Sequence, residues 1–378
     1  MPQIEEHEAD LHAKLEALAR IEKQLSTDGE APLYKILEGP TAHRLHDVIP
    51  TGAISLDLAL GVGGIPRGKI VELFGPEGSG KSTLALSVVK EAQKMGGVAV
   101  YIDAENVLDP EYAEALGIDL DRLWISQPSS GEEGFKVAEA VLEENAADVI
   151  VFDSVAAMVP KAELEGDIGD MKVGRMAAMM SQALRRLNVT VGKSNAVVIF
   201  INQIRMDVGS YGNPETTPGG KALKYYASIR LDIRSPRSNA ITKGKEQIGQ
   251  VCKVTVRKNK VGPPFRTAEF ALIYGKGIDG SDSLVDALLQ TGVWEMKGSW
   301  VMDKLTDSNV AQGKAKAAEL LNSDPDLAEI LTDTVYAAIR GEDLSEYREM
   351  LLAHTTSDAG PAGEEDLVDP ELLEEPAA

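Results

Sequence analysis

One stretch constrains this chain more than any other: residues 75–82 read GPEGSGKS and complete a GxxxxGK[ST] motif. An apolar run, KIVELF at 69–74, precedes the motif, and a run with helical character follows it. A strand, a glycine-rich turn and a helix N-terminus together let backbone N–H groups surround phosphate. The alternative, a chance match within a glycine-rich turn, does not explain this flanking pattern. The residues expected to bind the nucleotide here are Gly75, Pro76, Glu77, Gly78, Ser79, Gly80, Lys81, Ser82 and Thr83.

Two side chains of this predicted phosphate-binding loop have distinct chemistry. The Lys81 ammonium group is expected to reach the outer phosphates of a nucleotide. The Ser82 hydroxyl is expected to hold Mg²⁺, which prefers oxygen ligands and usually retains substrate phosphates among them.

Composition limits the class of protein. The 378 residues, 43% of them hydrophobic, suffice for one large domain and a smaller one with a substantial core. No apolar run approaches the ~20 residues that span a bilayer, and the acidic N-terminus MPQIEEHEAD is unlike a secretory signal. We therefore expect a cytoplasmic protein with no membrane partner. The single cysteine, Cys252, excludes an internal disulfide framework, and the five histidines show no metal-ligand spacing with it.

The net charge of −22 argues at first sight against binding nucleic acid, because phosphate binding is driven by Lys and Arg. Residues 355–378, however, contain eight carboxylates and no Lys or Arg, so the remainder of the chain carries −14. Acidic residues are concentrated at the two ends of the chain, so the net charge does not exclude nucleic-acid binding by a local basic patch.

The order of elements predicts an α/β fold. Strand-like runs at 69–74, 97–103, 148–153 and 196–202 alternate with helical patterns at 81–95, 134–144 and 175–191. Such alternation predicts a mostly parallel sheet flanked by helices, with right-handed crossovers. Three closely spaced runs follow at 228–233, 251–258 and 267–274, and we expect antiparallel strands there.

Four regions are expected along the chain. Residues 1–50 hold an amphipathic helix at 4–25 and a linker, and the helix packs on its own core or on a neighbouring subunit. The core is expected at 51–280, and a small α+β domain with a hairpin at 293–302 is expected at 281–354. Residues 355–378 form an acidic tail that is too polar to bury and is expected to be disordered.

Acidic residues follow two of the predicted parallel strands. Asp153 ends the run 148–153, where a carboxylate can order Mg²⁺ beside a phosphate-binding loop; a turn-starting Asp is the alternative. Asp103 and Glu105 follow the run 97–103, and a carboxylate there can accept the proton of water that attacks the γ-phosphate. We favour Glu105, which lies beyond the strand, over Asp103; the alternative for Glu105 is a solvated loop residue.

An amide pair follows the run 196–202. Gln203, directly after Asn202, can report a γ-phosphate through a hydrogen bond. The segment 205–220 that follows is rich in Gly, Pro, Asn and Thr, so it is a candidate order–disorder switch. An ordinary surface loop is the alternative.

The strings GPEGSGKS, IDAEN, VIVFDS, EGDIGD, MMSQALRRL, INQIRM, GNPETTPGGKALK and VRKNK together resemble the bacterial RecA recombinase family, from about Ile21 to Gly280. The resemblance implies a RecA-type core that uses ATP and Mg²⁺, and a DNA-dependent ATPase that forms a helical filament on single-stranded DNA. It also implies homologous pairing with double-stranded DNA, strand exchange in recombinational repair, and stimulation of self-cleavage of an SOS repressor.

The resemblance also assigns site residues. It implies that Glu105 is the catalytic glutamate, Asp153 the magnesium aspartate and Gln203 the γ-phosphate sensor. By the same resemblance Asp109 and Tyr112 lie on the adenine side. Lys258 and Lys260, in VRKNK, match lysines that reach a neighbouring subunit's ATP; a solvated basic strand edge is their alternative reading.

Two DNA-binding loops are implied as well, at 165–174 and 205–220. One departure from the family stands in the helix after the first loop, where this chain has Ala178 instead of a common arginine and carries Arg175 a turn earlier. The implied DNA contacts are Val173, Arg175, Arg185, Arg205, Val208, Gly219, Gly220 and Lys221.

Two other functions use the same motifs. A hexameric DNA helicase with a RecA core would form closed rings and open duplexes. An ATP-gated regulatory DNA-binding paralogue would have lost hydrolysis, and the presence of Lys81, Glu105 and Asp153 argues against it.

We predict that the acidic tail restrains access of DNA, because its eight carboxylates compete with DNA phosphate for the same basic surface. Truncation after His354 should leave thermal stability nearly unchanged and accelerate loading onto duplex DNA, most of all at low magnesium. The measurement is the loading rate across a magnesium titration. Equal rates for both forms would reduce the tail to a solubility element.

Overall fold

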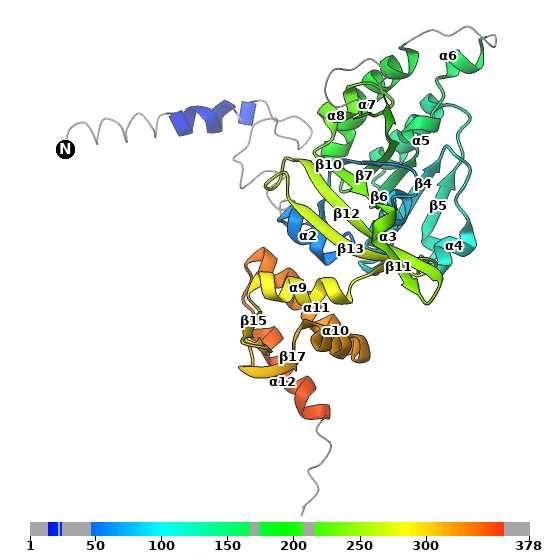
Figure 1. Ribbon diagram of the computed structural model, residues 1–378. Helices are drawn as coiled ribbons and strands as arrows, with labels where there is room; N and C mark the ends of the chain where they lie inside the picture. Colours follow the sequence, from blue (N-terminus) through cyan, green and yellow to red (C-terminus); the bar gives the residue numbers. More distant parts are fainter. Residues whose placement is uncertain (1–13, 22, 25–46, 167–173, 207–214, 359–378) are drawn as a thin grey trace, which may run out of the picture. The chain divides into compact units, whose positions relative to one another are not determined.

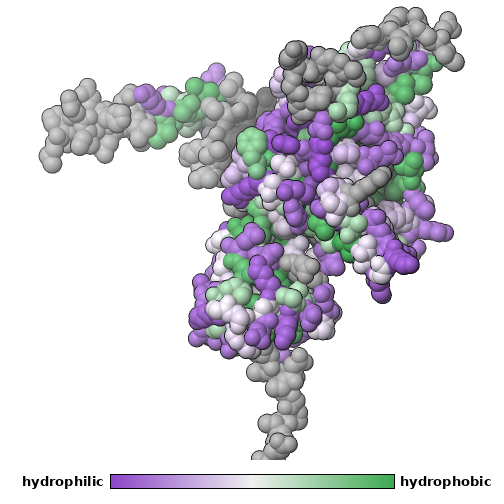
Figure 2. All heavy atoms as spheres, in the orientation of Figure 1, coloured by the Kyte–Doolittle hydropathy of each residue, from purple (hydrophilic) through white to green (hydrophobic). Residues whose placement is uncertain are grey.

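The computed structural model describes residues 14–21, 23–24, 47–166, 174–206 and 215–358 (Figure 1). The chain divides into two compact units, Met1–Gly280 and Ser281–Ala378. Within the predicted helix at 4–25, residues 14–21 and 23–24 are helical, and the rest of that range lies outside the described residues. Leu15, Leu18 and Ile21 are 51%, 48% and 42% exposed, and Figure 2 shows apolar atoms at the surface of this segment.

A ten-stranded sheet dominates the first unit, and its parallel half contains the four strands predicted at 69–74, 97–103, 148–153 and 196–202, together with β5 and β10. The strand order is β10–β3–β7–β6–β4–β5, and every neighbouring pair in this half is parallel. The strands are β3 (Ile70–Gly75), β4 (Ala99–Asp103), β5 (Leu123–Ser126), β6 (Val149–Asp153), β7 (Val197–Gln203) and β10 (Ile229–Arg234).

The other half of the sheet is antiparallel, as predicted, but the first of the three runs expected there, β10, pairs in parallel with β3 and is antiparallel to β12 alone. Strand β12 (Glu246–Asn259) pairs with β10, with β11 (Ala240–Lys243) and with β13 (Thr267–Ile273), which pairs with β14 (Gly277–Asp279). The α/β fold class expected from the sequence is therefore confirmed. Two short strand pairs lie outside this sheet in the described part of the first unit: β1 (Val48–Ile49) with β2 (Ile65–Pro66), and β8 (Arg205–Met206) with β9 (Glu215–Thr216).

Helices cover both faces of the sheet, so the unit has three layers (Figure 1). Successive side chains of a strand point to opposite faces, which divides the core in two. One core joins Val71, Leu73 and Tyr101 to α2 (Ile54–Leu60), α3 (Lys81–Lys94) and α4 (Pro110–Ala115). The other contains Phe152 and Phe200, stacked with ring centroids 4.5 Å apart, and packs on the remaining helices. These are α5 (Gly131–Glu143), α7 (Arg175–Lys193) and α8 (Ala222–Tyr226).

Some boundaries differ from the sequence prediction. Helix α5 begins at Gly131 rather than 134, because the Ser130 side chain caps it by accepting from the Glu133 N–H. Strand β5, helix α4 and the short helix α6 (Lys161–Leu164) were not expected, since each has too few residues to show a period.

The second unit contains four helices and a three-stranded sheet within its described residues. The predicted hairpin corresponds to β15 (Trp294–Lys297) and β16 (Trp300–Asp303), and β17 (Ser308–Gln312) adds a third strand. The helices are α9 (Ser281–Thr291), α10 (Lys314–Ser323), α11 (Pro325–Arg340) and α12 (Ser345–Asp358).

Helix α12 corrects one expected boundary. It continues to Asp358, so residues 355–358 are helical and not part of a disordered tail. A truncation that tests the tail should therefore follow Asp358. In the described parts of the chain, no helix has both the length and the apolar character needed to cross a membrane.

Candidate nucleotide site and DNA-facing residues

The predicted catalytic residues meet because parallel strands end at one edge of the sheet. Gly75 at the end of β3 is in register with Gln203 of β7, and Asp103 of β4 is in register with Asp153 of β6. The phosphate-binding loop leaves the sheet at this same edge and leads into α3. Parallel strand pairing thus brings the phosphate-binding loop, the carboxylates of Asp103 and Asp153 and the amide of Gln203 to one edge of the sheet.

The loop has the backbone that its glycines permit. Gly80 has φ +92° and is the N-cap of α3, and a Cβ atom there would lie 2.9 Å from the Leu272 side chain. A residue with a side chain would be both strained and crowded at this position. The Lys81 ammonium group, in an 8% exposed residue, donates to the Pro76 carbonyl at 2.6 Å. Burial lowers the pKa of Lys81, and the carboxylates of Asp153, Glu105 and Glu77 oppose that shift.

Ser82 and Asp153 are in direct contact. The Ser82 hydroxyl donates to Asp153 Oδ2 at 2.7 Å, and the buried Tyr101 hydroxyl donates to the same oxygen at 2.6 Å. Burial raises the pKa of Asp153, while the hydrogen bonds from Tyr101 and Ser82 lower it. A hydroxyl beside a carboxylate at the mouth of a phosphate-binding loop is a donor set that suits Mg²⁺.

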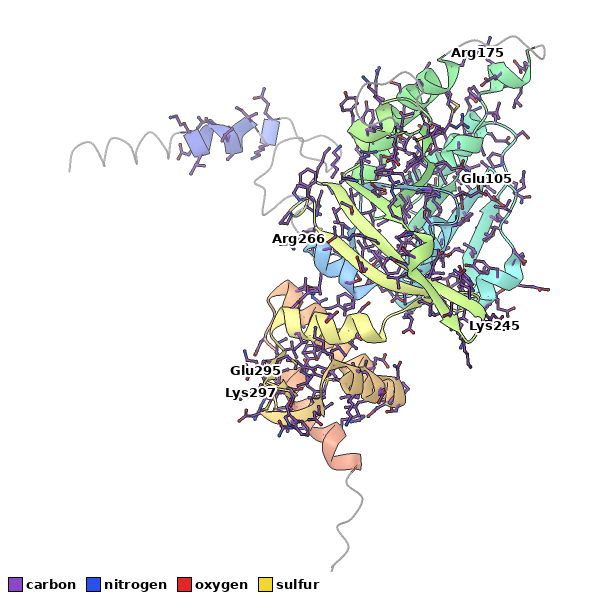
Figure 3. The ribbon with its side chains drawn as sticks, viewed as in Figure 1. Glu105, Arg175, Lys245, Arg266, Glu295 and Lys297 are labelled. Atoms are coloured by element: carbon purple, nitrogen blue, oxygen red, sulfur yellow. The ribbon has the colours of Figure 1, made fainter. Side chains whose placement is uncertain are left out.

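Glu105 lies next to the amide expected to sense the γ-phosphate. Its Oε1 accepts hydrogen bonds from the Ser154 hydroxyl and from Gln203 Nε2, the latter at 3.3 Å. Glu105, labelled in Figure 3, therefore contacts residues at the ends of both β6 and β7 and is partly buried. The predicted base and the predicted sensor touch each other directly.

Two buried polar atoms at this edge lack a protein partner. In the described part of the chain, Ser79 Oγ and Asp103 Oδ1 are the buried side-chain atoms without a hydrogen bond. One belongs to the phosphate-binding loop and the other follows β4, so both suit a site that binds a polar, hydrated ligand. No cluster of three or more His, Cys, Asp or Glu that could hold a metal occurs among the residues described.

The residues expected on the adenine side have different roles. The Tyr112 hydroxyl lies 3.0 Å from Thr83 Oγ1, so it contacts the first turn of α3. Asp109 is the N-cap of α4, and its carboxylate accepts from the Glu111 N–H at 2.9 Å. The side chain of Asp109 therefore has a structural task in α4.

Lys258 and Lys260 lie away from their own phosphate-binding loop. Lys258 pairs with Arg230 near the start of β10, whereas the loop follows the opposite end of the parallel strands. The Lys258 ammonium group donates to the backbone carbonyls of Lys224 and Tyr225 at 2.8 and 2.9 Å. Burial lowers its pKa, as do the charges of Lys260 and Arg230, and Glu72 opposes them.

The predicted DNA-facing residues gather around α7 and the start of α8. Arg175 lies at the N-terminal end of α7 (Figure 3), where its guanidinium donates to the Ala162 carbonyl, and Arg185 is exposed on the same helix. Arg205 in β8 and Lys221, the N-cap of α8, are exposed too. Val173 and Val208 lie outside the described residues.

Gly219 and Gly220 have a packing reason to be glycines. Both have positive φ values, +84° and +75°. A Cβ at Gly219 would lie 3.2 Å from Val155, and a Cβ at Gly220 would lie 2.8 Å from Ala177 of α7. Close packing against α7 thus requires glycine here, independently of any approach of DNA.

Three functional contacts were not predicted. Ser154 is visible as the residue after Asp153, and Tyr101 as one hydroxyl in the apolar run GVAVYID, so both left a signal in the sequence. Gln250 of β12 donates to the Gly78 carbonyl at 2.9 Å, a contact across 172 residues that no local pattern reveals.

The fold and this edge define a phosphate-loop ATPase of the α/β class. The profile of the RecA N-terminal domain family matches residues 12–279. This chain is 49% identical over 328 residues to Protein RecA of Bacteroides thetaiotaomicron, covering 86% of this chain and 98% of that protein. It is 50% identical to Protein RecA of Symbiobacterium thermophilum (82% and 88% covered) and 51% identical to that of Thermus aquaticus (83% and 90% covered).

The chain belongs to the RecA family. It is a DNA-dependent ATPase of DNA recombination and repair, the activity of that family. A crystal structure of the RadB recombinase aligns with a TM-score of 0.47 and 24% identity over 62% of this chain and 99% of that one; the family assignment comes from the sequence relatives.

We predict that Glu105→Gln binds ATP and fails to hydrolyse it. The glutamine keeps the shape and can still contact Ser154 and Gln203, but it cannot accept a proton from water. Turnover in the presence of DNA should fall about 10²- to 10⁴-fold, with nucleotide affinity nearly unchanged. Steady-state hydrolysis and equilibrium nucleotide binding measure the two effects, and normal turnover would mean that another residue is the base.

Proposed function

We propose that this chain forms a helical filament on single-stranded DNA and, with ATP and Mg²⁺, catalyses homologous pairing and strand exchange. The observation that carries the proposal is the contact of Glu105 with Gln203 at 3.3 Å. It joins the base beside the phosphate-binding loop to the strand that leads into the second predicted DNA loop. The hydrogen bond between Gln203 and Glu105 thus links the residue proposed for hydrolysis to the segment proposed to bind DNA.

The roles at the sheet edge follow from chemistry. Lys81 neutralises charge on the outer phosphates, and Ser82 with Asp153 serves the Mg²⁺ that supplies further charge stabilisation there. Glu105 accepts the proton of the attacking water. Gln203 exchanges its hydrogen bond to Glu105 for one to the γ-phosphate when ATP is bound.

A polar network connects Gln203 to the base of the second DNA loop. The neighbouring Asn202 donates to the Pro218 carbonyl at 3.2 Å and to the fully buried Glu72 carboxylate at 3.1 Å. Arg230 donates to the other oxygen of Glu72 at 2.5 Å. A rearrangement of Gln203 therefore acts on residues that hold both ends of the loop, which makes the segment 205–220 the nucleotide-responsive element.

Assembly of subunits completes the site in this proposal. Lys258 and Lys260 lie toward the end of the sheet opposite their own loop, where they can serve the ATP of a neighbouring subunit. The exposed Leu15, Leu18 and Ile21 supply an apolar surface that a neighbour can cover. The nucleotide is then shared between consecutive subunits.

Further partners follow from the same reading. Arg175, Arg185, Arg205 and Lys221 offer positive charge around α7, and we propose that they contact single- and double-stranded DNA with Val173, Val208, Gly219 and Gly220. We also propose a cytoplasmic location and stimulation of an SOS repressor of the self-cleaving type.

The test of this function is ATP hydrolysis with and without single-stranded DNA, together with electron microscopy. We expect DNA to stimulate hydrolysis and filaments to form. Replacing both Lys258 and Lys260 by Ala should abolish the stimulation, because the neighbour's ATP loses two positive charges. Lys253→Ala on the same strand, where Lys253 pairs with Glu269 at 3.2 Å, is the matched control and should keep it. Full turnover in a dilute monomer would contradict the shared site, and closed rings with duplex opening would favour a helicase.

We predict that Arg185 contributes one phosphate contact to single-stranded DNA binding. The neighbouring Arg186 is equally exposed but pairs with Glu139 at 2.8 Å, so Arg186→Ala is a matched control. Arg185→Ala should lower the slope of log K against log salt by about 0.7 to 1, and Arg186→Ala should change it less. Binding isotherms at several salt concentrations measure the slopes; identical slopes for both variants would place the DNA elsewhere.

A further inference from the structure

Tyr101 and Asp153 project from neighbouring strands on the same face of the sheet. Tyr101 of β4 is in register with Val151 of β6, so Asp153 lies two residues further along the same face. Tyr101 is 2% exposed and belongs to the apolar core beneath α3. Its ring fills space that a phenylalanine ring would fill equally well, so the hydroxyl is the feature that needs explaining.

The Tyr101 hydroxyl is hydrogen-bonded to the Asp153 carboxylate. It donates to Asp153 Oδ2 at 2.6 Å, and the Ser82 hydroxyl donates to the same oxygen at 2.7 Å. The two donors reach the oxygen from different elements, β4 within the sheet and α3 after the phosphate-binding loop. A buried hydroxyl is costly without a partner, and a buried carboxylate likewise. Each of these groups therefore satisfies the other.

The surroundings of Asp153 make its orientation matter. Asp103 stands beside it in register, and Glu105 accepts from Ser154, the next residue. Neighbouring carboxylates disfavour the charged form of a carboxylate, and hydrogen bonds donated to that charged form offset the effect. Ser82 has a second task, because its oxygen also serves the cation. Tyr101 contacts the carboxylate from inside the sheet and leaves the nucleotide side open.

We propose that Tyr101 is a positioning residue for the cation site, whose hydroxyl holds the Asp153 carboxylate in the orientation that serves Mg²⁺ together with Ser82. This inference rests on the metal role proposed above for Ser82 and Asp153. Tyr101 is buried and its hydroxyl donates to Asp153, so it acts on the cation through that carboxylate. Its substitution should thus weaken cation binding without weakening the hold on the nucleotide itself.

The test uses Tyr101→Phe in the full-length protein, with Mn²⁺ as the probe and a saturating non-hydrolysable ATP analogue. Free Mn²⁺ is measured by electron paramagnetic resonance. We expect the dissociation constant of Mn²⁺ to rise about tenfold, the usual effect of losing a hydrogen bond to a charged group. Affinity for the analogue in the presence of a chelator should not change.

Tyr274→Phe is the control, since it also removes one hydrogen-bonded phenolic hydroxyl of the first unit, which accepts from Gln247 Nε2 at 2.8 Å and has no assigned role at the nucleotide. It should leave Mn²⁺ affinity unchanged once the analogue is saturating. A double variant distinguishes positioning of Asp153 from a general loss of stability. In an Asp153→Asn background, Tyr101→Phe should have no further effect on Mn²⁺ binding. A purely structural role for Tyr101 would weaken binding in both backgrounds and would overturn the inference.

The remaining outcomes separate the two proposals. If Asp153→Asn weakens Mn²⁺ binding and Tyr101→Phe does not, Tyr101 has no positioning role and the metal site stands. If Asp153→Asn leaves Mn²⁺ affinity unchanged, the metal role proposed for Asp153 is itself wrong, and the inference about Tyr101 is lost with it.

Discussion

Parallel pairing of β3, β7, β6 and β4 is the constraint on which the functional part of this protein depends. It forces residues far apart in sequence to end at one edge, so that Gly75 meets Gln203 and Asp103 meets Asp153. No local interaction could assemble these groups. The apolar interior of the strands, buried on both faces by helices, fixes the register and hence the site.

The residues described at this edge of the sheet include three carboxylates and one lysine. Asp103 and Asp153 are buried, and Glu105 is partly buried, with Lys81 as the cation whose pKa responds to Asp153 and Glu105. Hydroxyl groups of Ser82 and Tyr101 hold the Asp153 carboxylate, and the hydroxyl of Ser154 holds that of Glu105. Hydroxyl donors satisfy a carboxylate without neutralising it, so the site keeps the negative potential that would attract the proposed Mg²⁺.

Much of this arrangement was readable from the sequence, and the parts that were not have physical reasons. The phosphate-binding loop, the strand ends at Asp153 and Gln203, and the antiparallel half of the sheet follow from local patterns. The adenine-side role of Asp109 stays a prediction; its carboxylate also caps α4, a role that an Asp directly before Pro110 could have indicated in the sequence. The contact of Gln250 with Gly78 depends on long-range strand pairing, which no local pattern predicts. Helix α12 has no strong apolar stripe, so the sequence does not indicate where it ends.

Strand β12 connects two places that the proposed assembly must keep apart. At Gln250 it touches the phosphate-binding loop of its own subunit, and eight residues later, at Lys258, it presents the side chain proposed to reach the next subunit's ATP. A strand advances about 3.4 Å per residue, so these two points are separated by about 27 Å. Consecutive nucleotides would then be spaced by a single continuous piece of backbone. The ladder of β12 with β10 shifts register once in this stretch, between Arg230 and Leu231, so a displacement at one nucleotide site would reach the next along β12 through that irregularity.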